Sequence, residues 1–201
     1  MKKKLIQIFA KIPVPAKVKT RLIPSLGAYG ACQFYSSLLT TTIKNSSFTK
    51  IDAEIWLYGK PNEAFNKIID SIDKMQIHRQ QGDNLGDRMH FALVDGLTRA
   101  DYVVLVGSDC PAITSDHYVE LFKRLERHDL VFIPAIDGGY VAIGARKIDK
   151  DIFKGITWGG NMVYKMTLSK AQRLGLSVSS LQALRDIDTP EDLIWQKGDK
   201  I

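Results

Sequence analysis

The sequence contains few cysteines and no long hydrophobic run. Its two cysteines, Cys32 and Cys110, lie far apart and form neither a CxxC pair nor a spacing typical of zinc ligands. This pattern argues against a disulfide framework and favours reduced thiols in a cytoplasmic protein. The apolar stretch at residues 5–9 is too short for a signal peptide or a membrane span, so we expect neither. For Cys110, a small buried side chain is commoner than a nucleophile.

Acidic residues are missing from the first quarter of the chain. Residues 1–51 contain nine Lys and Arg and no Asp or Glu, although the formal net charge of the whole chain is only +6. Positive charge confined to one segment favours a local anion site over an extended nucleic-acid surface. Aromatic residues also do not alternate with these basic residues, as they do in proteins that bind single-stranded nucleic acid. We therefore expect a phosphorylated small molecule as the partner, and no nucleic acid.

Segments typical of strands and helices alternate along the whole chain. Apolar runs predict strands, and segments with apolar residues at helical spacing lie between them. The expected strands are residues 5–10, 53–58, 75–79, 102–106, 130–134, 140–143 and 176–181, and the expected helices are 27–43, 61–72, 85–97, 115–126 and 162–174. No repeat, low-complexity tract or linker interrupts this order, so residues 1–201 are expected to form one domain. The alternation predicts a three-layer α/β/α sandwich around a Rossmann-like, mixed and mainly parallel sheet.

The most informative stretch is residues 101–111, DYVVLVGSDCP. Its consecutive apolar residues show no alternation, which predicts a strand covered on both faces. Ligands of open α/β sheets bind beyond the carboxyl ends of such strands, where Asp109 is expected to lie. Asp109 is either a turn residue or a ligand for a hard cation such as Mg²⁺ or Mn²⁺. Proteins bind such ions through one or two carboxylates together with substrate phosphates.

The loop after the first strand is basic and stiff. Pro13 and Pro15 are incompatible with a helix there. Lys11, Lys19 and Arg21 supply ammonium and guanidinium donors suited to phosphate oxygens. A solvated basic loop without function is the alternative. The loop matches neither a Walker motif nor GxGxxG.

Two glycine-rich corners are further candidates. Gly82 and Gly86 lie near the start of the third expected helix, whose free N–H groups favour anions or base edges. Arg88 in its first turn is unfavourable for the helix dipole, which favours a position facing a ligand. Asp137 precedes a Gly-Gly pair at the carboxyl end of another strand, so it could face the same crevice as Asp109. An ordinary cap and a hairpin turn explain these corners equally well on local grounds.

Two late segments complete the candidates. Trp158 lies in a Thr-Trp-Gly-Gly loop and is either a lid or stacking platform, or a buried anchor. Asp186 and Asp188 precede Thr189 and Pro190, which predict the N-terminus of a helix. Capping explains the residues that follow, but it does not require these two acids. One of them is therefore the candidate for a second metal ligand.

Five motifs occur in order across nearly the whole chain. They are FAKIPVP with VKTRL at residues 9–22, GDNLGDRM at 82–89, GSDCP at 107–111, DGGY at 137–140 and DIDTPEDL at 186–193. Together they resemble a bacterial family of uncharacterised glycosyltransferase-A-like transferases, also described as selenodomain-associated. That family is similar to the molybdopterin and phospholactate guanylyltransferases. It usually has glycine where this chain has Ala16, and serine where this chain has Gly159.

The resemblance implies a nucleotide-diphospho-sugar transferase fold with a sheet of about seven strands, somewhat larger than average. It also implies a metal-dependent transferase that binds a nucleotide or nucleotide sugar and serves an unknown acceptor, as a glycosyltransferase. The alternatives are a nucleotidyltransferase that releases pyrophosphate and a nucleotide-binding protein without turnover. A homodimer is left open.

The resemblance further implies a role for each candidate residue. Nucleotide and phosphate contacts fall to Ala10, Lys11, Lys19, Arg21, Gly82, Asp83, Leu85, Gly86 and Arg88. A divalent metal, Mg²⁺ or Mn²⁺, is expected at Asp109 and Asp188, with Asp186 as the alternative to Asp188. The residues expected to face the acceptor or sugar are Asp137, Gly139, Tyr140 and Trp158. Asp137 is the candidate general base and, with Asp109, a candidate catalytic residue.

Overall fold

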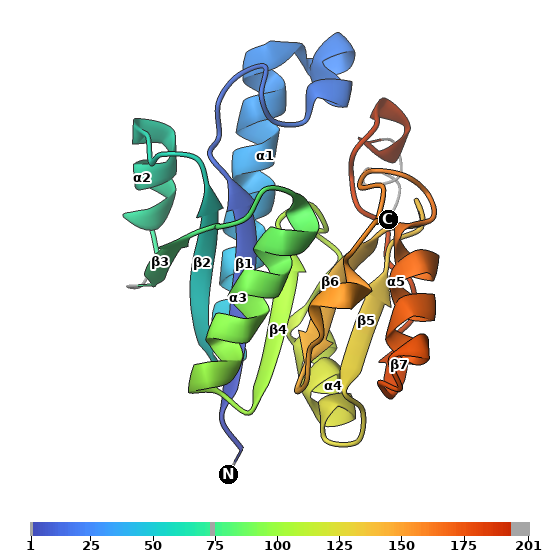
Figure 1. The fold of residues 1–201 in the computed structure, drawn as a ribbon. Helices are drawn as coiled ribbons and strands as arrows, with labels where there is room; N and C mark the ends of the chain where they lie inside the picture. The colour runs from blue at the N-terminus through green and yellow to red at the C-terminus, as the bar shows by residue number, and fades with distance from the viewer. Residues whose placement is uncertain (1, 73–74, 194–201) are drawn as a thin grey trace.

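The computed structural model describes residues 2–72 and 75–193 and contains the strands and helices expected between residues 5 and 181 (Figure 1). The helix predicted to begin at Thr189 and Pro190 falls in part outside the described residues. The strands are β1 (Lys4–Lys11), β2 (Asp52–Tyr58), β3 (Gln76–Arg79), β4 (Tyr102–Gly107), β5 (Leu130–Pro134), β6 (Tyr140–Ala145) and β7 (Val178–Ser180). The helices are α1 (Ile23–Ser47), α2 (Glu63–Ile69), α3 (Leu85–Arg99), α4 (Ser115–Leu125) and α5 (Val163–Arg173), with 3₁₀ turns η1 (Thr20–Leu22) and η2 (Lys150–Ile152). A single domain over residues 1–201 stays a prediction, because part of that range lies outside the described residues.

The strands form one sheet in the order β3-β2-β1-β4-β6-β5-β7. β6 runs antiparallel to β4 and β5, and all other neighbours are parallel. Helices cover both faces of the sheet (Figure 1), so the expected three-layer α/β fold with a mainly parallel sheet is confirmed. Among the described residues, none of the helices combines the length and the apolar character needed to traverse a bilayer.

β1 and β4 lie in the middle of the sheet, and both of their faces are buried. Ile6 and Val104 pack into the core formed with α1, α2 and α4. Leu5 and Val103, which point to the opposite face, pack into the core formed with α3 and α5. This double coverage explains why the two strands are continuous apolar runs rather than alternating ones.

A buried carboxylate connects α3 to the strands beneath it. Glu54 on β2 is only 2% exposed. It accepts hydrogen bonds from Gln7 Nε2 (3.0 Å), Trp56 Nε1 (2.8 Å) and both terminal nitrogens of Arg99 (2.8 and 2.9 Å). Arg99 is the last residue of α3. The network therefore holds the C-terminus of α3 over β1 and β2, while the N-terminus of α3 extends toward the loops at the carboxyl edge of the sheet.

The carboxyl ends of β1 and β4 lie side by side at a reversal of strand order. The chain continues from β1 through α1 to β2 on one side, whereas β4 pairs with the other side of β1. A later segment crosses this edge: Leu184 bridges to Ala135, and Ile187 N donates to Asp109 O (3.1 Å). The fold thereby brings the acids near residue 187 next to the loop after β4. Such a reversal is where open α/β sheets bind ligands.

Candidate functional site

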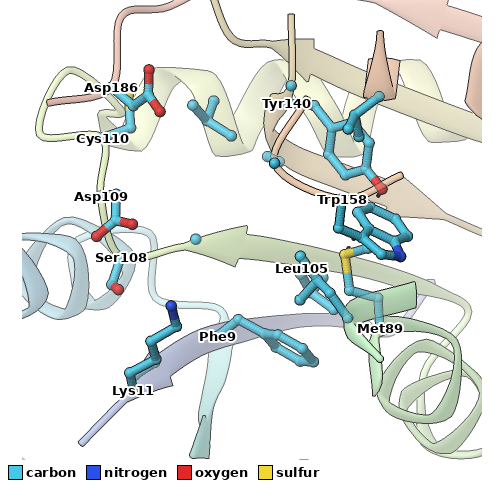
Figure 2. A pocket seen from close by; sticks show the side chains of 18 of the residues that line it. Phe9, Lys11, Met89, Leu105, Ser108, Asp109, Cys110, Tyr140, Trp158 and Asp186 are labelled. Carbon is cyan, nitrogen blue, oxygen red and sulfur yellow. Dashed lines mark hydrogen bonds between the residues drawn. The ribbon is translucent and has the colours of Figure 1, made fainter. Parts of the chain in front are cut away.

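A cavity of about 350 Å³ opens at the carboxyl ends of β1 and β4 and beside the start of β6 (Figure 2). Its walls come from segments that are distant in the sequence. The predicted residues that line it are Ala10, Lys11, Leu85, Arg88, Asp109, Asp137, Gly139, Tyr140 and Trp158, together with the alternative acid Asp186. The structure therefore gathers parts of all five sequence motifs at one cavity.

The two ends of the cavity differ in character. Figure 2 shows Lys11, Ser108, Asp109 and Asp186 gathered at one end. The opposite end is formed mainly by apolar and aromatic side chains, namely Phe9, Met89, Leu105, Tyr140 and Trp158 (Figure 2). We call the first the acidic end, because the carboxylates of Asp109 and Asp186 there outnumber the ammonium of Lys11, and we call the second the apolar end.

Lys19 lies between the two acids that the resemblance implies as metal ligands. Its side chain is only 2% exposed, and its ammonium donates to Ile187 O (2.5 Å) and Asp188 Oδ1 (3.0 Å). The same ammonium lies 3.2 Å from Asp109 Oδ1, without an aligned hydrogen bond to it. Asp188 Oδ2 also accepts from Arg21 Nη1 (3.1 Å). The structure thus brings Asp109 and Asp188 together, but around a buried lysine.

This arrangement does not fit a divalent ion between Asp109 and Asp188, because the Lys19 ammonium occupies the position between them. Across residues 2–72 and 75–193, no three His, Cys, Asp or Glu side chains are grouped as a metal site. Two carboxylates can still suffice when substrate phosphates supply the other ligands. The expectation that Asp188 is a ligand therefore lacks support in this geometry, and contact of Lys19 with phosphate stays a prediction.

Asp186 fits a cation better than Asp188 does. It lines the same cavity as Asp109 and Asp137, whereas Asp188 lines a separate hollow. Burial raises the pKa of Asp186 to about 6, and the charges of Asp137 and Asp188 act in the same direction. Crowded carboxylates of this kind are relieved by a bound cation. Asp109 and Asp186 thus line one cavity, and a divalent ion held by them together with substrate phosphates stays a prediction.

The hollow beside the cavity is strongly basic. It has a volume of about 230 Å³ and shares Lys11 and Asp109 with the main cavity. Its other charged lining residues are Lys17, Lys19, Arg21 and Asp188. The basic segment expected from the sequence therefore does lie next to the acidic end, although Lys19 is internal and the Arg21 side chain is largely exposed.

Tyr35 joins the ends of β1 and β4. Its hydroxyl accepts from Lys11 N (2.7 Å) and Ser108 Oγ (3.1 Å) and donates to Lys11 O (3.1 Å). Burial, together with the charge of Asp109, raises the pKa of Tyr35, so the phenol stays neutral. Tyr35 lines the cavity, but the sequence suggested only a core residue of an amphipathic helix. Its helical spacing is the same as that of its apolar neighbours, so no local signal distinguishes it.

Sequence reasoning missed two more lining residues, Tyr58 and Gln80, and Tyr58 is 52% exposed and so marks the mouth of the cavity. Tyr58, the last residue of β2, lies with its ring centroid 4.3 Å from the guanidinium of Arg88. Gln80 donates through Nε2 to Ala10 O (3.2 Å) and Trp56 O (2.9 Å). Gln80 lies two residues before the predicted loop at 82–86, and this proximity was the sequence signal that could have identified it.

Three residues of the predicted nucleotide loop do not line the cavity: Gly82, Asp83 and Gly86. Gly82 has φ +134°. A Cβ on Gly86 would lie 2.6 Å from Trp158 Cζ2 and 2.8 Å from Phe153 Cβ. Gly86 therefore allows α3 to pack closely against the Trp158 loop. Contacts of these three residues with a nucleotide stay predictions.

The Asp-Gly-Gly corner is both a hairpin turn and a close approach. It connects the antiparallel strands β5 and β6, and Asp137 Oδ1 accepts from Gly139 N (2.8 Å). Gly138 has φ +93°, and a Cβ there would lie 2.0 Å from Asn161 O. Two features of this corner therefore require glycine at position 138: the positive φ of the turn, and the close approach of the loop that carries Trp158.

Trp158 is in part a buried anchor, and its role as a lid or stacking platform stays a prediction. It lines the cavity, yet it also packs beside the core and lies 6.2 Å from the Phe153 ring, centroid to centroid. Cys110, by contrast, is a buried thiol whose Sγ contacts Arg185 O at 3.4 Å. Burial raises the pKa of Cys110 to about 11, which argues against a nucleophilic thiolate.

Comparison with solved structures agrees with this architecture. A candidate nucleotide-diphospho-sugar transferase from Desulfovibrio desulfuricans is 32% identical, with a TM-score of 0.91 over 100% of this chain and 89% of that chain. The 4-diphosphocytidyl-2C-methyl-D-erythritol synthase of Anaerococcus prevotii is 13% identical, with a TM-score of 0.62 over 98% of each chain. The inositol-1-phosphate CTP transferase of T. maritima is 11% identical, with a TM-score of 0.53 over 100% of this chain and 96% of that chain. The last two similarities concern the fold alone.

The fold is thus that of the nucleotide-diphospho-sugar transferases. No curated protein matches the sequence. A family model does match residues 42–160, which is more than half of the chain and includes three of the five motifs. The chain therefore belongs to the bacterial family described as uncharacterized protein conserved in bacteria, DUF2064.

Proposed function

We propose that the cavity binds a nucleoside triphosphate or a nucleotide sugar, and that the protein transfers the nucleotidyl or sugar group to an acceptor. The observation that carries this proposal is the meeting of five distant motifs at one cavity, at the strand reversal where this class of sheet binds ligands. The similarity to a candidate nucleotide-diphospho-sugar transferase supports it.

Phosphates would lie where the cavity meets the basic hollow. Lys11 lines both spaces, and Arg21 and Lys17 line the hollow. Their charges would attract a polyanion and stabilise the charge that develops on the leaving group. The nucleoside would extend toward the mouth, where Tyr58 offers an aromatic face and Gln80 and Leu85 line the wall.

Asp109 and Asp186 would hold a divalent ion, Mg²⁺ or Mn²⁺, together with the phosphates. When bound, such an ion neutralises phosphate charge and orients the leaving group. Lys19 would act from the side of the basic hollow: its ammonium lies 3.2 Å from Asp109 Oδ1 and would stabilise the negative charge of that carboxylate. Asp137 remains the candidate base, and its Oδ1 is already oriented by Gly139 N.

Glycosyl and nucleotidyl transfer use the same arrangement, so their products must be separated by experiment. The protein is incubated with Mn²⁺ and with each nucleoside triphosphate or nucleotide sugar, against a panel of acceptors. Released pyrophosphate identifies nucleotidyl transfer, and a released nucleoside diphosphate identifies glycosyl transfer. We expect turnover to be abolished in Asp109→Asn and retained in the matched control Asp70→Asn, whose carboxylate is exposed near α2.

One other function is consistent with the site. A nucleotide-binding protein without turnover would bind the same ligands. The replacement of the usual glycine by Ala16 favours this alternative, because Ala16 has φ +61°, a conformation that suits glycine and strains alanine in the basic loop. Tight nucleotide binding with neither product formed would establish this alternative. Absence of nucleotide binding under all conditions would refute both functions.

A further inference from the structure

The apolar end of the cavity has a chemistry of its own. Its wall is made by the side chains of Phe9, Met89, Leu105, Tyr140 and Trp158, which come from β1, α3, β4, β6 and the Trp158 loop. Met89 and Leu105 are each only 4% exposed. The wall is therefore a recess of the core built by five separate segments, not a patch of outer surface (Figure 2).

Few polar side-chain atoms reach this end. The Tyr140 hydroxyl donates to the Met89 thioether at 3.8 Å. The indole N–H of Trp158 also lies at this end, and the hydroxyl of the buried Thr167 is within hydrogen-bonding reach of Tyr140. A sugar carries a hydroxyl on most of its carbons, and a nucleobase carries several donors and acceptors along its edges. Either group would lose most of these hydrogen bonds to water on entering, and each loss would weaken binding about tenfold or more.

The apolar end also adjoins a set of acceptors. Asp109 and Asp186 line the same cavity at its acidic end, and Asp137 lines it close enough to Asp186 for its charge to raise the pKa of Asp186. A hydroxyl group placed between the two ends could donate to one of these carboxylates, while an attached hydrocarbon faces the apolar wall. The cavity, at about 350 Å³, has the size of a small-molecule site.

We infer that the acceptor is an alcohol with a hydrocarbon or aryl body, which fills the apolar end and directs its hydroxyl to the acidic end. The word acceptor rests on the proposed transferase function, whereas binding of the alcohol does not. In the transfer, the alcohol oxygen bonds to the transferred carbon or phosphorus. The nucleoside diphosphate or pyrophosphate leaves with the electron pair of the broken bond, and the hydroxyl proton passes to a carboxylate of the acidic end.

The inference is tested without nucleotide, through a probe inside the apolar end. The protein is labelled with ¹³C at the methionine methyl groups, and the Met89 signal is assigned with Met89→Leu. Cyclohexanol and myo-inositol have the same ring of carbons but differ in their number of hydroxyls. We expect cyclohexanol to shift the Met89 signal saturably and myo-inositol to leave it unchanged. Among linear alcohols, affinity is expected to rise about fourfold per methylene until the recess is full.

A plugged variant gives the control. Leu105 lines the apolar end and is 4% exposed, so Leu105→Phe adds volume inside the recess. It is expected to weaken cyclohexanol binding at least tenfold, while Ala64→Leu on the exposed side of α2 leaves it unchanged. Should Leu105→Phe lose its native circular dichroism, Phe9→Trp on β1 takes its place.

Three results would overturn the inference: a Met89 shift by myo-inositol equal to that by cyclohexanol, saturable occupation of the Met89 site by a free nucleoside, or no saturable shift with any alcohol. These outcomes are independent of the transferase proposal, which is decided by nucleotide binding and product formation. Alcohol binding together with an absence of nucleotide binding would retain the apolar subsite and refute the transferase.

Discussion

Removal of the Lys19 charge is the most informative perturbation of the site. Lys19→Met keeps most of the buried stem but deletes an ammonium that contacts Ile187 O, Asp188 and Asp109. Breaking a fully buried ion pair costs about 3–5 kcal/mol, because the remaining charge is left without a partner. Here the two carboxylate side chains are 47% and 38% exposed, so water compensates in part. We expect the free energy of unfolding to fall by about 2 kcal/mol.

Denaturant unfolding at pH 7, followed by circular dichroism, measures this loss. The matched control is Arg21→Met, which removes the other cation that contacts Asp188. Because the Arg21 side chain is 61% exposed, this change is expected to cost at most about 1 kcal/mol. In the double variant Lys19→Met/Asp188→Asn, the cost is expected to be smaller than the sum of the two single costs, because no unpaired charge remains at Asp188.

The same variant separates the two candidate metal sites. With Lys19 replaced by methionine, Asp109 and Asp188 become a pair of carboxylates without an intervening ammonium. We expect Mn²⁺ to restore part of the lost stability in Lys19→Met but not in the double variant. Unchanged stability of Lys19→Met would refute the role of the ammonium. Mn²⁺ binding by the wild type that depends on Asp188 and not on Asp186 would refute the assignment of the metal to the cavity.

Two further predictions concern the supports of the site. For Glu54, burial acts to raise the pKa, but hydrogen bonds from Arg99, Trp56 and Gln7 outweigh it, and the pKa is lowered. Its contribution to stability is thus complete above about pH 4.3 and is lost as the pH falls through the lowered value. Acid unfolding curves should show a smaller loss between pH 7 and pH 3 in Glu54→Gln than in the wild type, and parallel curves would contradict this. Gly138→Ala should lower the free energy of unfolding by more than about 2 kcal/mol and alter Trp158 fluorescence. Gly155 also has a positive φ, but a Cβ there would meet no neighbour within 4 Å, so Gly155→Ala should lower the free energy of unfolding by only about 1 kcal/mol. Equal costs would show that the contact with Asn161 has no effect.

The fold could be predicted from the sequence because its main signals are local. The apolar run of β4 is continuous because both of its faces are covered, and that requirement can be read from a few adjacent residues. The prediction was least accurate where a segment has little periodic pattern. The second helix ends at Ile69 rather than near residue 72, and the last strand is reduced to Val178–Ser180.

The site was predictable as a set of motifs but not as a set of contacts. Asp109 could be placed at a strand end from local sequence alone. The partners of Lys19 could not, because Asp188 lies 169 residues further along the chain. Whether Lys19 faces a ligand or an internal carboxylate depends on how two loops pack. For the same reason Tyr35 resembled an ordinary core residue, and the packing role of Gly86 against Trp158 was hidden.

A crystal of the complex with a nucleotide and Mn²⁺ would show directly where the nucleotide binds. We expect phosphates beside Lys11 and Asp109, with the base toward Tyr58 at the mouth of the cavity. A second basic hollow, lined by Lys2, Arg99 and Arg146, lies at the opposite end of β4. A nucleotide bound there, with the cavity at the carboxyl edge of the sheet empty, would refute the proposed function.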